Sequence, residues 1–157
     1  MAGTQSAGIL LYRRRDAGLE VLLVHPGGPF WARRDEGAWS IPKGEFLPPE
    51  AAEAAARREW REETGLEFEG VLVPLPPIAQ SRAKTVHAFA AEGDIDPAQI
   101  RSNVFEMEWP PRSGRRQAFP EVDRAAWFTL GEARVRIVAG QRPLLDALGD
   151  HTMAERS

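Results

Sequence analysis

The chain has 157 residues, which is enough for one domain with a buried core, and its formal net charge is −3. A slightly acidic chain has no overall attraction to nucleic acid or to an anionic membrane. It contains no cysteine, so disulfides and thiolate chemistry are excluded, which fits a cytoplasmic protein. There is no membrane-spanning apolar run and no signal-peptide pattern. We expect a single domain over residues 1–157, without a nucleic-acid or membrane partner.

Two apolar runs of strand length open the chain. Residues 6–12 and 20–25 flank the polar segment 13–18, and this pattern predicts a hairpin. The three arginines of the segment could clamp phosphate, but a solvated turn is the simpler interpretation. His25 ends the second run, where we interpret it as a structural residue.

A predicted loop over residues 30–39 contains two tryptophans beside two arginines. Aromatic rings stack on nucleobases and guanidinium groups bind phosphates, so Trp31, Arg33 and Arg34 are candidate substrate contacts. Trp39 is better interpreted as a core residue. Lys43 follows directly before a glycine and is the strongest single candidate for a contact to phosphate charge.

The segment from Gly44 to Leu66 follows the pattern G-x5-E-x7-R-E-U-x-E-E-x-G-U, where U is a bulky apolar residue. The alanine-rich part of this segment favours a helix, two prolines suit its start, and Gly65 is placed to end it in a left-handed cap. Three glutamates then lie on one stripe at i, i+3 and i+4. Small residues continue the stripe toward the start of the helix, at Ala52, Ala55 and Ala56. The helix can therefore pack closely on its neighbour.

The stripe consists of Glu59, Glu62 and Glu63, which is unfavourable without a cation. Like charges three or four apart cost roughly 0.2–0.5 kcal/mol per pair. Carboxylates at the negative end of a helix lose about 0.3–1 kcal/mol each. A solvated acidic helix end would explain three glutamates alone, but chance rarely fills the whole pattern. Because carboxylate oxygens are the ligands that Mg²⁺ prefers, the pattern predicts a magnesium site.

The segment resembles the signature box of the Nudix hydrolases, and every fixed position is filled. The resemblance implies an α+β fold, an α/β/α sandwich whose mixed sheet is flanked by the box helix and C-terminal helices. It also implies hydrolysis of a nucleoside diphosphate linked to another moiety, with two or more Mg²⁺ or Mn²⁺ ions as cofactors.

By position in the box, the resemblance makes Glu59, Glu62 and Glu63 metal ligands, together with a backbone carbonyl near Lys43 and Gly44. Arg58 and Glu50 would position the helix and its carboxylates. The general base is then Glu63, Glu59 or a later glutamate, Glu121, and the sequence does not rank the three.

Beyond the box, residues 71–73 predict a strand that prolines restrict to an edge, and residues 84–91 predict another by their alternation. Lys84 is a candidate substrate contact or a surface residue. The long segment 93–120 contains alternating apolar and acidic residues over 104–109, which favours a short ordered strand or arm. A basic cluster follows that either binds polyphosphate or is solvated: Arg112, Arg115 and Arg116.

Glu121 precedes Trp127 by six positions. This spacing resembles the late Nudix segment in which diadenosine tetraphosphate hydrolases place a metal-binding or catalytic glutamate, with Asp123 as the alternative here. A capping box at Thr129 predicts a helix through about Val138. A second helix over 143–148 is expected to stop at Gly149, with a frayed tail over 150–157.

The run from Ile41 to Gly44 resembles the Nudix branch that acts on dinucleoside polyphosphates or diphosphoinositol polyphosphates. We therefore expect a small-molecule nucleotide substrate, with asymmetric cleavage of a dinucleoside polyphosphate such as diadenosine tetraphosphate into ATP and AMP. The alternatives are a nucleoside triphosphate pyrophosphohydrolase, a diphosphoinositol polyphosphate phosphohydrolase or, from another class, a nucleotide-sensing module without turnover. The oligomeric state stays open.

Overall fold

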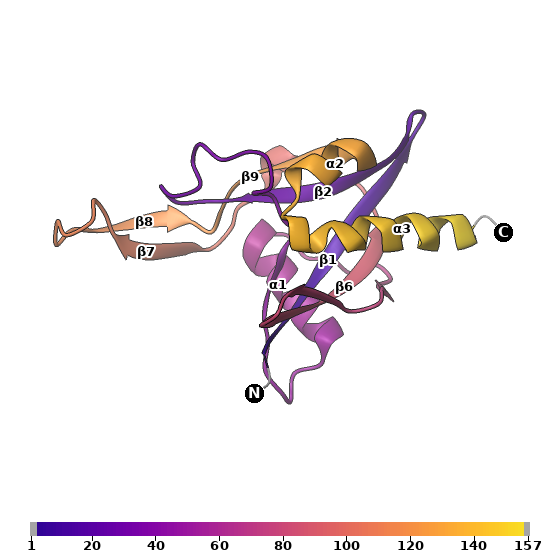
Figure 1. Cartoon of the computed structure of the whole chain (residues 1–157), viewed down its shortest axis with the longest axis horizontal. Coiled ribbons are helices and arrows are strands. Elements are labelled where there is room, and N and C mark those ends of the chain that lie inside the picture. The colour runs from indigo at the N-terminus through magenta and orange to yellow at the C-terminus, as the bar shows by residue number, and fades with distance from the viewer. Residues whose placement is uncertain (1–2, 156–157) are drawn as a thin grey trace.

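The computed structural model describes residues 3–155, which form a mixed sheet with helices on both faces (Figure 1). The sheet runs in the order β4-β6-β1-β2-β9, with β3 paired to β1 and β5 paired to β6. Only the β1–β6 pair among these is parallel. Its strands are β1 (Thr4–Arg15), β2 (Gly18–Pro26), β3 (Lys43–Glu45), β4 (Val73–Pro74), β5 (Ile78–Ser81), β6 (Lys84–Glu92) and β9 (Val122–Thr129). The helices are α1 (Ala52–Thr64), α2 (Leu130–Arg136) and α3 (Arg142–Glu155), with short 3₁₀ turns η1 (Pro97–Gln99) and η2 (Ala139–Gln141).

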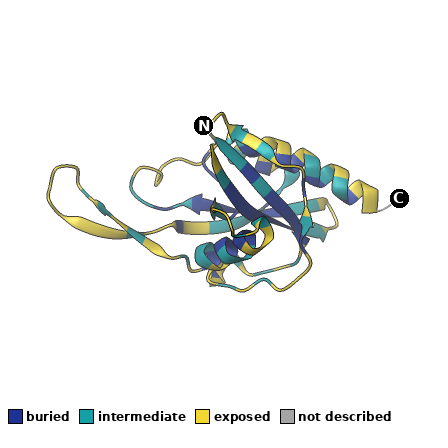
Figure 2. Cartoon of the chain, turned by 90° about the horizontal axis from the view of Figure 1, so that it is seen from below, coloured by how far each residue is buried: buried dark blue, intermediate teal, exposed yellow. Residues whose placement is uncertain are grey.

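The central strand β1 is apolar on both faces because each face lies under a helix. Successive side chains of a strand point to opposite faces, so Ile9 and Leu11 pack toward α1 while Leu10 and Tyr12 pack toward α2 and α3. Figure 2 shows the resulting band of buried residues along the middle of the sheet. The predicted sandwich is confirmed, and no helix within residues 3–155 is long and apolar enough to cross a membrane.

The first hairpin is longer than the sequence predicts. Strands β1 and β2 stay paired up to Arg15 and Gly18, so the arginines are in the strand and not in the turn. Arg13 forms ion pairs with Glu20 at 2.7 Å and Asp94 at 2.9 Å, which stabilise the extended pairing. These ion pairs support the interpretation in which the arginine run does not bind phosphate.

The C-terminal helix also differs from the prediction, because α3 continues through Gly149 to Glu155. The expectation of a helix end at residue 149 and a frayed tail from 150 is wrong for residues 150–155, and 156–157 lie outside the described residues. Tertiary burial outweighs the glycine: Thr152 is only 4% exposed and donates a hydrogen bond to the Gly149 carbonyl at 3.0 Å. An ion pair between His151 and Glu155 adds support on the outer face.

The alternating segment forms a separate two-stranded sheet, β7 (Val104–Glu108) and β8 (Arg116–Pro120). This hairpin extends away from the body as an arm, and most of its residues are exposed (Figures 1 and 2). Beyond the strands, Trp109 makes an edge contact with Phe30 at 5.4 Å between ring centroids. The sequence-based prediction of a short ordered strand or arm is confirmed.

Candidate active site

Helix α1 presents the glutamate stripe as the sequence predicts. It begins at Ala52, after the turn that holds the two prolines, and Gly65 caps its end with a φ of 75°. The glycine N–H bonds the Arg61 carbonyl at 2.8 Å, because glycine adopts the left-handed conformation without strain. Ala55 and Ala56 are fully buried, so α1 lies close against β1.

Arg58 connects the stripe to the loop before the helix. Its Nε and Nη2 each lie 2.9 Å from a carboxylate oxygen of Glu50, and its Nη1 lies 2.7 Å from Glu59 Oε1 and 3.3 Å from Glu62 Oε2. The hydrogen bonds to Arg58 lower the pKa of Glu50. A planar guanidinium fixes the direction of each carboxylate that it contacts, so this geometry suits a positioning role for Arg58 and Glu50, which stays a prediction.

Glu63 is turned toward the strand that precedes the helix. The backbone N–H of Lys43 donates to Glu63 Oε1 at 3.1 Å, and burial raises the pKa of Glu63 to about 8. Burial likewise raises the pKa of Glu59 and of Glu121, and the charge of Glu62 raises both further. Glu121 also raises the pKa of Glu59 and Glu63. The fold therefore brings the residue predicted from the spacing to Trp127 into the same electrostatic cluster as the three box glutamates.

Gly44 is the closest approach of β3 to the helix. A Cβ atom added at Gly44 would lie 2.0 Å from Glu59 Oε2, so only glycine leaves room for this carboxylate. Strand pairing holds the glycine in place, because Gly44 lies opposite Ala7 on β1. The first fixed residue of the box thus leaves space for the carboxylate of Glu59, a candidate metal ligand in the same box.

These carboxylates fit a divalent cation by their chemistry. Oxygen donors suit Mg²⁺. Burial, together with neighbouring carboxylates, raises the pKa of Glu59, Glu63 and Glu121, so their charged forms are disfavoured until a cation is bound. As they stand, no three acidic or histidine side chains within residues 3–155 are grouped closely enough to hold a metal. The reason is visible in their partners: Glu59 and Glu62 contact Arg58, while Glu63 accepts from Lys43.

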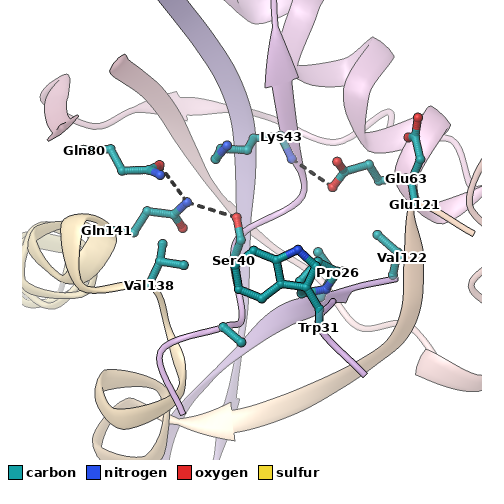
Figure 3. Close-up of a pocket in the computed structure, with 12 residues that line it drawn as sticks. Pro26, Trp31, Ser40, Lys43, Glu63, Gln80, Glu121, Val122, Val138 and Gln141 are labelled. Atoms are coloured by element: carbon teal, nitrogen blue, oxygen red, sulfur yellow. Dashed lines mark hydrogen bonds between the residues drawn. The ribbon is translucent and has the colours of Figure 1, made fainter. Parts of the chain in front are cut away.

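A cavity of about 300 Å³ opens beside the cluster, and Figure 3 shows two chemically different ends. Glu63 and Glu121 lie at one end, the amides of Gln80 and Gln141 lie at the other, and the Lys43 side chain lies between them. The remaining lining residues are Val24, Pro26, Trp31, Ala38, Ser40, Val122 and Val138. Burial lowers the pKa of the Lys43 ammonium group, with a further contribution from Lys84.

The predicted substrate contacts divide into two groups. Lys43 and Trp31 line the cavity, and Lys84 lies near enough to act on Lys43, although it is not in the cavity wall. Arg33 and Arg34 lie in a separate shallow depression beside Arg124. Arg112 and Arg115 lie between the strands of the arm. None of these four arginines is therefore in the cavity wall, although the Arg34 guanidinium lies over the ring of Trp31, 5.5 Å from its centroid.

Two residues that were weighed as alternatives have structural partners. The His25 ring is fully buried, with Nδ1 2.9 Å from Asp123 Oδ1 and Nε2 2.5 Å from the Arg34 carbonyl oxygen. Trp39 is 3% exposed and packs against both His25 and Phe128, as predicted for a core residue. Since Asp123 is engaged by His25, Glu121 is the acidic residue of this segment that reaches the cavity.

Sequence reasoning did not find the amide end of the cavity. Ser40, Gln80 and Gln141 come from a loop, the edge strand β5 and the turn η2, so no local pattern connects them. Gln141 is the last residue of η2, and a single glutamine after an alanine and a glycine carries no specific signal.

Fold and site together define an α+β domain with a carboxylate-rich cleft. A family model described as NUDIX domain matches residues 4–148, so the chain belongs to the Nudix family. Nudix domains are usually pyrophosphohydrolases and typically depend on divalent metal ions.

Solved structures share the fold at low identity. A C. elegans Ap4A hydrolase in a binary complex matches with a TM-score of 0.64 and 22% identity, over 96% of this chain and 98% of that chain. The NUDIX domain of Shewanella oneidensis NrtR complexed with ADP ribose matches with a TM-score of 0.66 and 16% identity, over 97% of this chain and 90% of that chain. A mutT/nudix family protein from Listeria innocua matches with a TM-score of 0.65 and 19% identity, over 99% of this chain and 97% of that chain. At these identities the likeness shows the fold and not the branch.

Proposed function

We propose that this protein is a Mg²⁺-dependent pyrophosphohydrolase that cleaves a phosphoanhydride bond in a nucleoside diphosphate-linked substrate. The observation that carries the proposal is that Glu63, Glu121 and Lys43 line the same cavity, in electrostatic contact with Glu59 and Glu62. The cavity thus combines carboxylates that can bind metal cations with an ammonium group that can bind phosphate.

The chain's own residues suit this reaction. Glu59, Glu62 and Glu63 would hold the metal, which when bound neutralises phosphate oxygens and lowers the pKa of the attacking water. Lys43 is the cavity's cationic side chain and would bind the phosphates. Glu121 is the most exposed of the four glutamates, and partial burial of its carboxyl group and the charge of Glu62 raise its pKa. It is therefore suited to accept the proton of the attacking water.

For the substrate, we propose a dinucleoside polyphosphate such as diadenosine tetraphosphate, cleaved asymmetrically into ATP and AMP. Support comes from the run Ile41 to Gly44, which resembles this branch. A nucleoside triphosphate and a diphosphoinositol polyphosphate are the competing substrates within the same chemistry.

The test is hydrolysis of a substrate panel with Mg²⁺, with the products separated by chromatography. The panel contains diadenosine tetraphosphate, the nucleoside triphosphates, ADP-ribose and a diphosphoinositol polyphosphate. We expect ATP and AMP from the first, and Glu62→Gln and Glu63→Gln should lower kcat by about a hundredfold or more. Glu69→Gln is the matched control, because Glu69 is exposed and follows the box. Nucleotide binding without turnover in the unmutated protein would favour the sensing module instead.

A further inference from the structure

The amide end of the cavity is built on Gln141, a fully buried polar residue. Its Oε1 accepts from the Ile41 backbone N–H at 3.1 Å. Its Nε2 donates to Ser40 Oγ at 3.0 Å and to Gln80 Oε1 at 3.1 Å. Both ends of this side-chain amide are therefore engaged by the protein.

These partners leave Gln141 one orientation. A backbone N–H can only donate, so the atom that faces Ile41 must be the amide oxygen. The Ser40 hydroxyl donates its proton to the Ile41 carbonyl at 2.7 Å, so it can only accept from Gln141. Two independent neighbours thus agree on which atom of the Gln141 amide is the oxygen and which is the nitrogen. Hydrogen-bond partners are the proper basis for this assignment.

The orientation passes on to Gln80. Because Gln141 presents an N–H, Gln80 must turn its oxygen toward Gln141, and its own NH₂ group then faces elsewhere. No residue within 3–155 accepts a hydrogen bond from Gln80 Nε2, although the half-buried side chain lines the cavity. Gln80 therefore has two N–H donors without an acceptor among residues 3–155, while its oxygen is engaged by Gln141.

The backbone holds Gln80 in position. Strand β5 pairs with β6, and η2 packs against β5 at Gly140, where an added Cβ would lie 2.1 Å from the Gln80 carbonyl oxygen. The contact fixes the distance between Gln80 and Gln141. The pair of amides is thus a preorganised wall, and it does not depend on a mobile surface side chain.

The amides and the carboxylates lie at opposite ends of the cavity, as the base and the phosphates lie at opposite ends of a nucleotide. A cavity of about 300 Å³ is at the small end for ligand sites and takes one nucleoside moiety. Phosphates at the carboxylate end, within reach of Lys43, would put the base toward the amides, beside apolar residues such as Val138. The indole of Trp31 lies in the same wall and offers a face for the base.

We infer that Gln80 reads the substrate's nucleobase as a hydrogen-bond donor, held in that role by Gln141, and that the site prefers a base with an oxo group over one with an amino group at the contacted edge. This inference rests on the proposed function in taking the ligand to be a nucleotide. Within the proposed class of dinucleoside polyphosphates it favours a member with 6-oxopurine bases over diadenosine tetraphosphate. Among purines, the 6-oxo group of guanine or hypoxanthine accepts a hydrogen bond, whereas the 6-amino group of adenine would set donor against donor. A donor left unpaired in this way weakens binding by about tenfold.

The test is calorimetric binding of inosine monophosphate and adenosine monophosphate, which differ at the 6-position. The unmutated protein should bind the inosine nucleotide about tenfold more tightly. Gln80→Glu keeps the bond from Gln141 but offers only acceptors, so the preference should reverse, whatever its charge does to the absolute affinities. Gln80→Met should abolish the preference. Gln99→Glu is the matched control, because Gln99 is exposed on η1 and should keep the wild-type ratio.

Gln141→Glu tests the positioning role. Ile41, Ser40 and Gln80 can all donate to a carboxylate there, so Gln80 should turn its NH₂ inward and its oxygen to the cavity. The protein should then bind adenosine monophosphate more tightly than inosine monophosphate, although residue 80 is unchanged. A substitution at Gln141 would not have this effect if Gln141 only stabilised the fold. A folded variant with the wild-type ratio would overturn the positioning role; if this variant does not fold, the Gln80 variants decide the inference.

Hydrolysis of diadenosine and diinosine tetraphosphate, measured in parallel, separates this inference from the proposed function. If the protein turns over substrate but its affinities for inosine and adenosine monophosphate differ by less than twofold, base recognition by Gln80 is overturned and the hydrolase proposal is not affected. A clear ratio without turnover would support base reading in a protein that binds nucleotides but does not cleave them. Binding of neither mononucleotide at millimolar concentration, or an unchanged ratio in Gln80→Glu, would also overturn it.

Discussion

Arg58 and Glu50 form a bidentate ion pair, in which Nε and Nη2 each lie 2.9 Å from a carboxylate oxygen. The pair leaves Nη1 of Arg58 directed at Glu59 and Glu62. Glu50 thus influences the candidate metal ligands through the guanidinium, without contacting the cavity. Such outer partners orient the ligands of a metal site and are worth nearly as much to it as the ligands themselves.

Arg58→Lys should lower kcat/KM and the affinity for Mn²⁺ by about 10–100-fold while the protein stays folded. An ammonium group cannot contact Glu50 in two places and reach Glu59 as well. Steady-state kinetics and metal titration measure the effect. Arg61→Lys is the control, because Arg61 is exposed and has one long ion pair, to Glu67 at 3.6 Å. Equal effects of the two substitutions would show that Arg58 has no special role.

Gly44→Ala should abolish most activity, because its methyl group would occupy the position of the Glu59 carboxylate. We expect a loss of at least about a hundredfold in kcat, with the circular dichroism spectrum retained. Gly131→Ala is the matched control: no atom lies within 4 Å of an added Cβ at this residue of α2, so it should gain about 0.5–1 kcal/mol of stability and keep activity. Full activity in Gly44→Ala would place Glu59 outside the site.

Removal of metal should make the protein's stability depend on pH. The folded pKa of Glu63 is about 8 against 4.5 as its ordinary value, so the folded state binds the proton more tightly than the unfolded state. This contribution is fully present below pH about 4.5 and is lost as the pH rises through about 8. With metal chelated, the Tm should therefore fall across this window. Saturating Mg²⁺ should flatten the curve, and so should Glu63→Gln; a Tm that rises with pH in chelator would contradict the assignment.

Thr152→Asp should destabilise the protein by about 2 kcal/mol or more, because it buries a charge on the inner face of α3. Ala154→Asp adds the same charge at an exposed position of the same helix and should change stability by less than about 0.5 kcal/mol. Thermal unfolding followed by circular dichroism compares the two. Equal Tm values would restore the frayed tail that the sequence suggests.

Local patterns predicted much of this molecule. The box helix, its glycine cap and its row of glutamates depend on neighbours within one or two turns, so spacing alone determines them. The position of Glu121 also follows from a short pattern anchored on Trp127. Its meeting with Glu59 and Glu63, however, is a consequence of the fold.

Long-range packing explains what the sequence did not predict. Gly149 is a helix breaker by composition, yet burial of Thr152 keeps α3 continuous. The arginines at 112 and 115 suit phosphate by chemistry, but the arm carries them away from the cavity. Gln80 and Gln141 are 61 residues apart and meet only through the contact of η2 with β5.

The most direct test of the metal site is titration with Mn²⁺, followed by electron paramagnetic resonance, of the unmutated protein, Glu62→Gln, Glu63→Gln and the control Glu69→Gln. The account predicts saturable binding in the unmutated and control proteins, and affinity lower by about tenfold or more in the two box variants. Unchanged Mn²⁺ affinity in Glu62→Gln and Glu63→Gln, or no saturable binding in the unmutated protein, would contradict it.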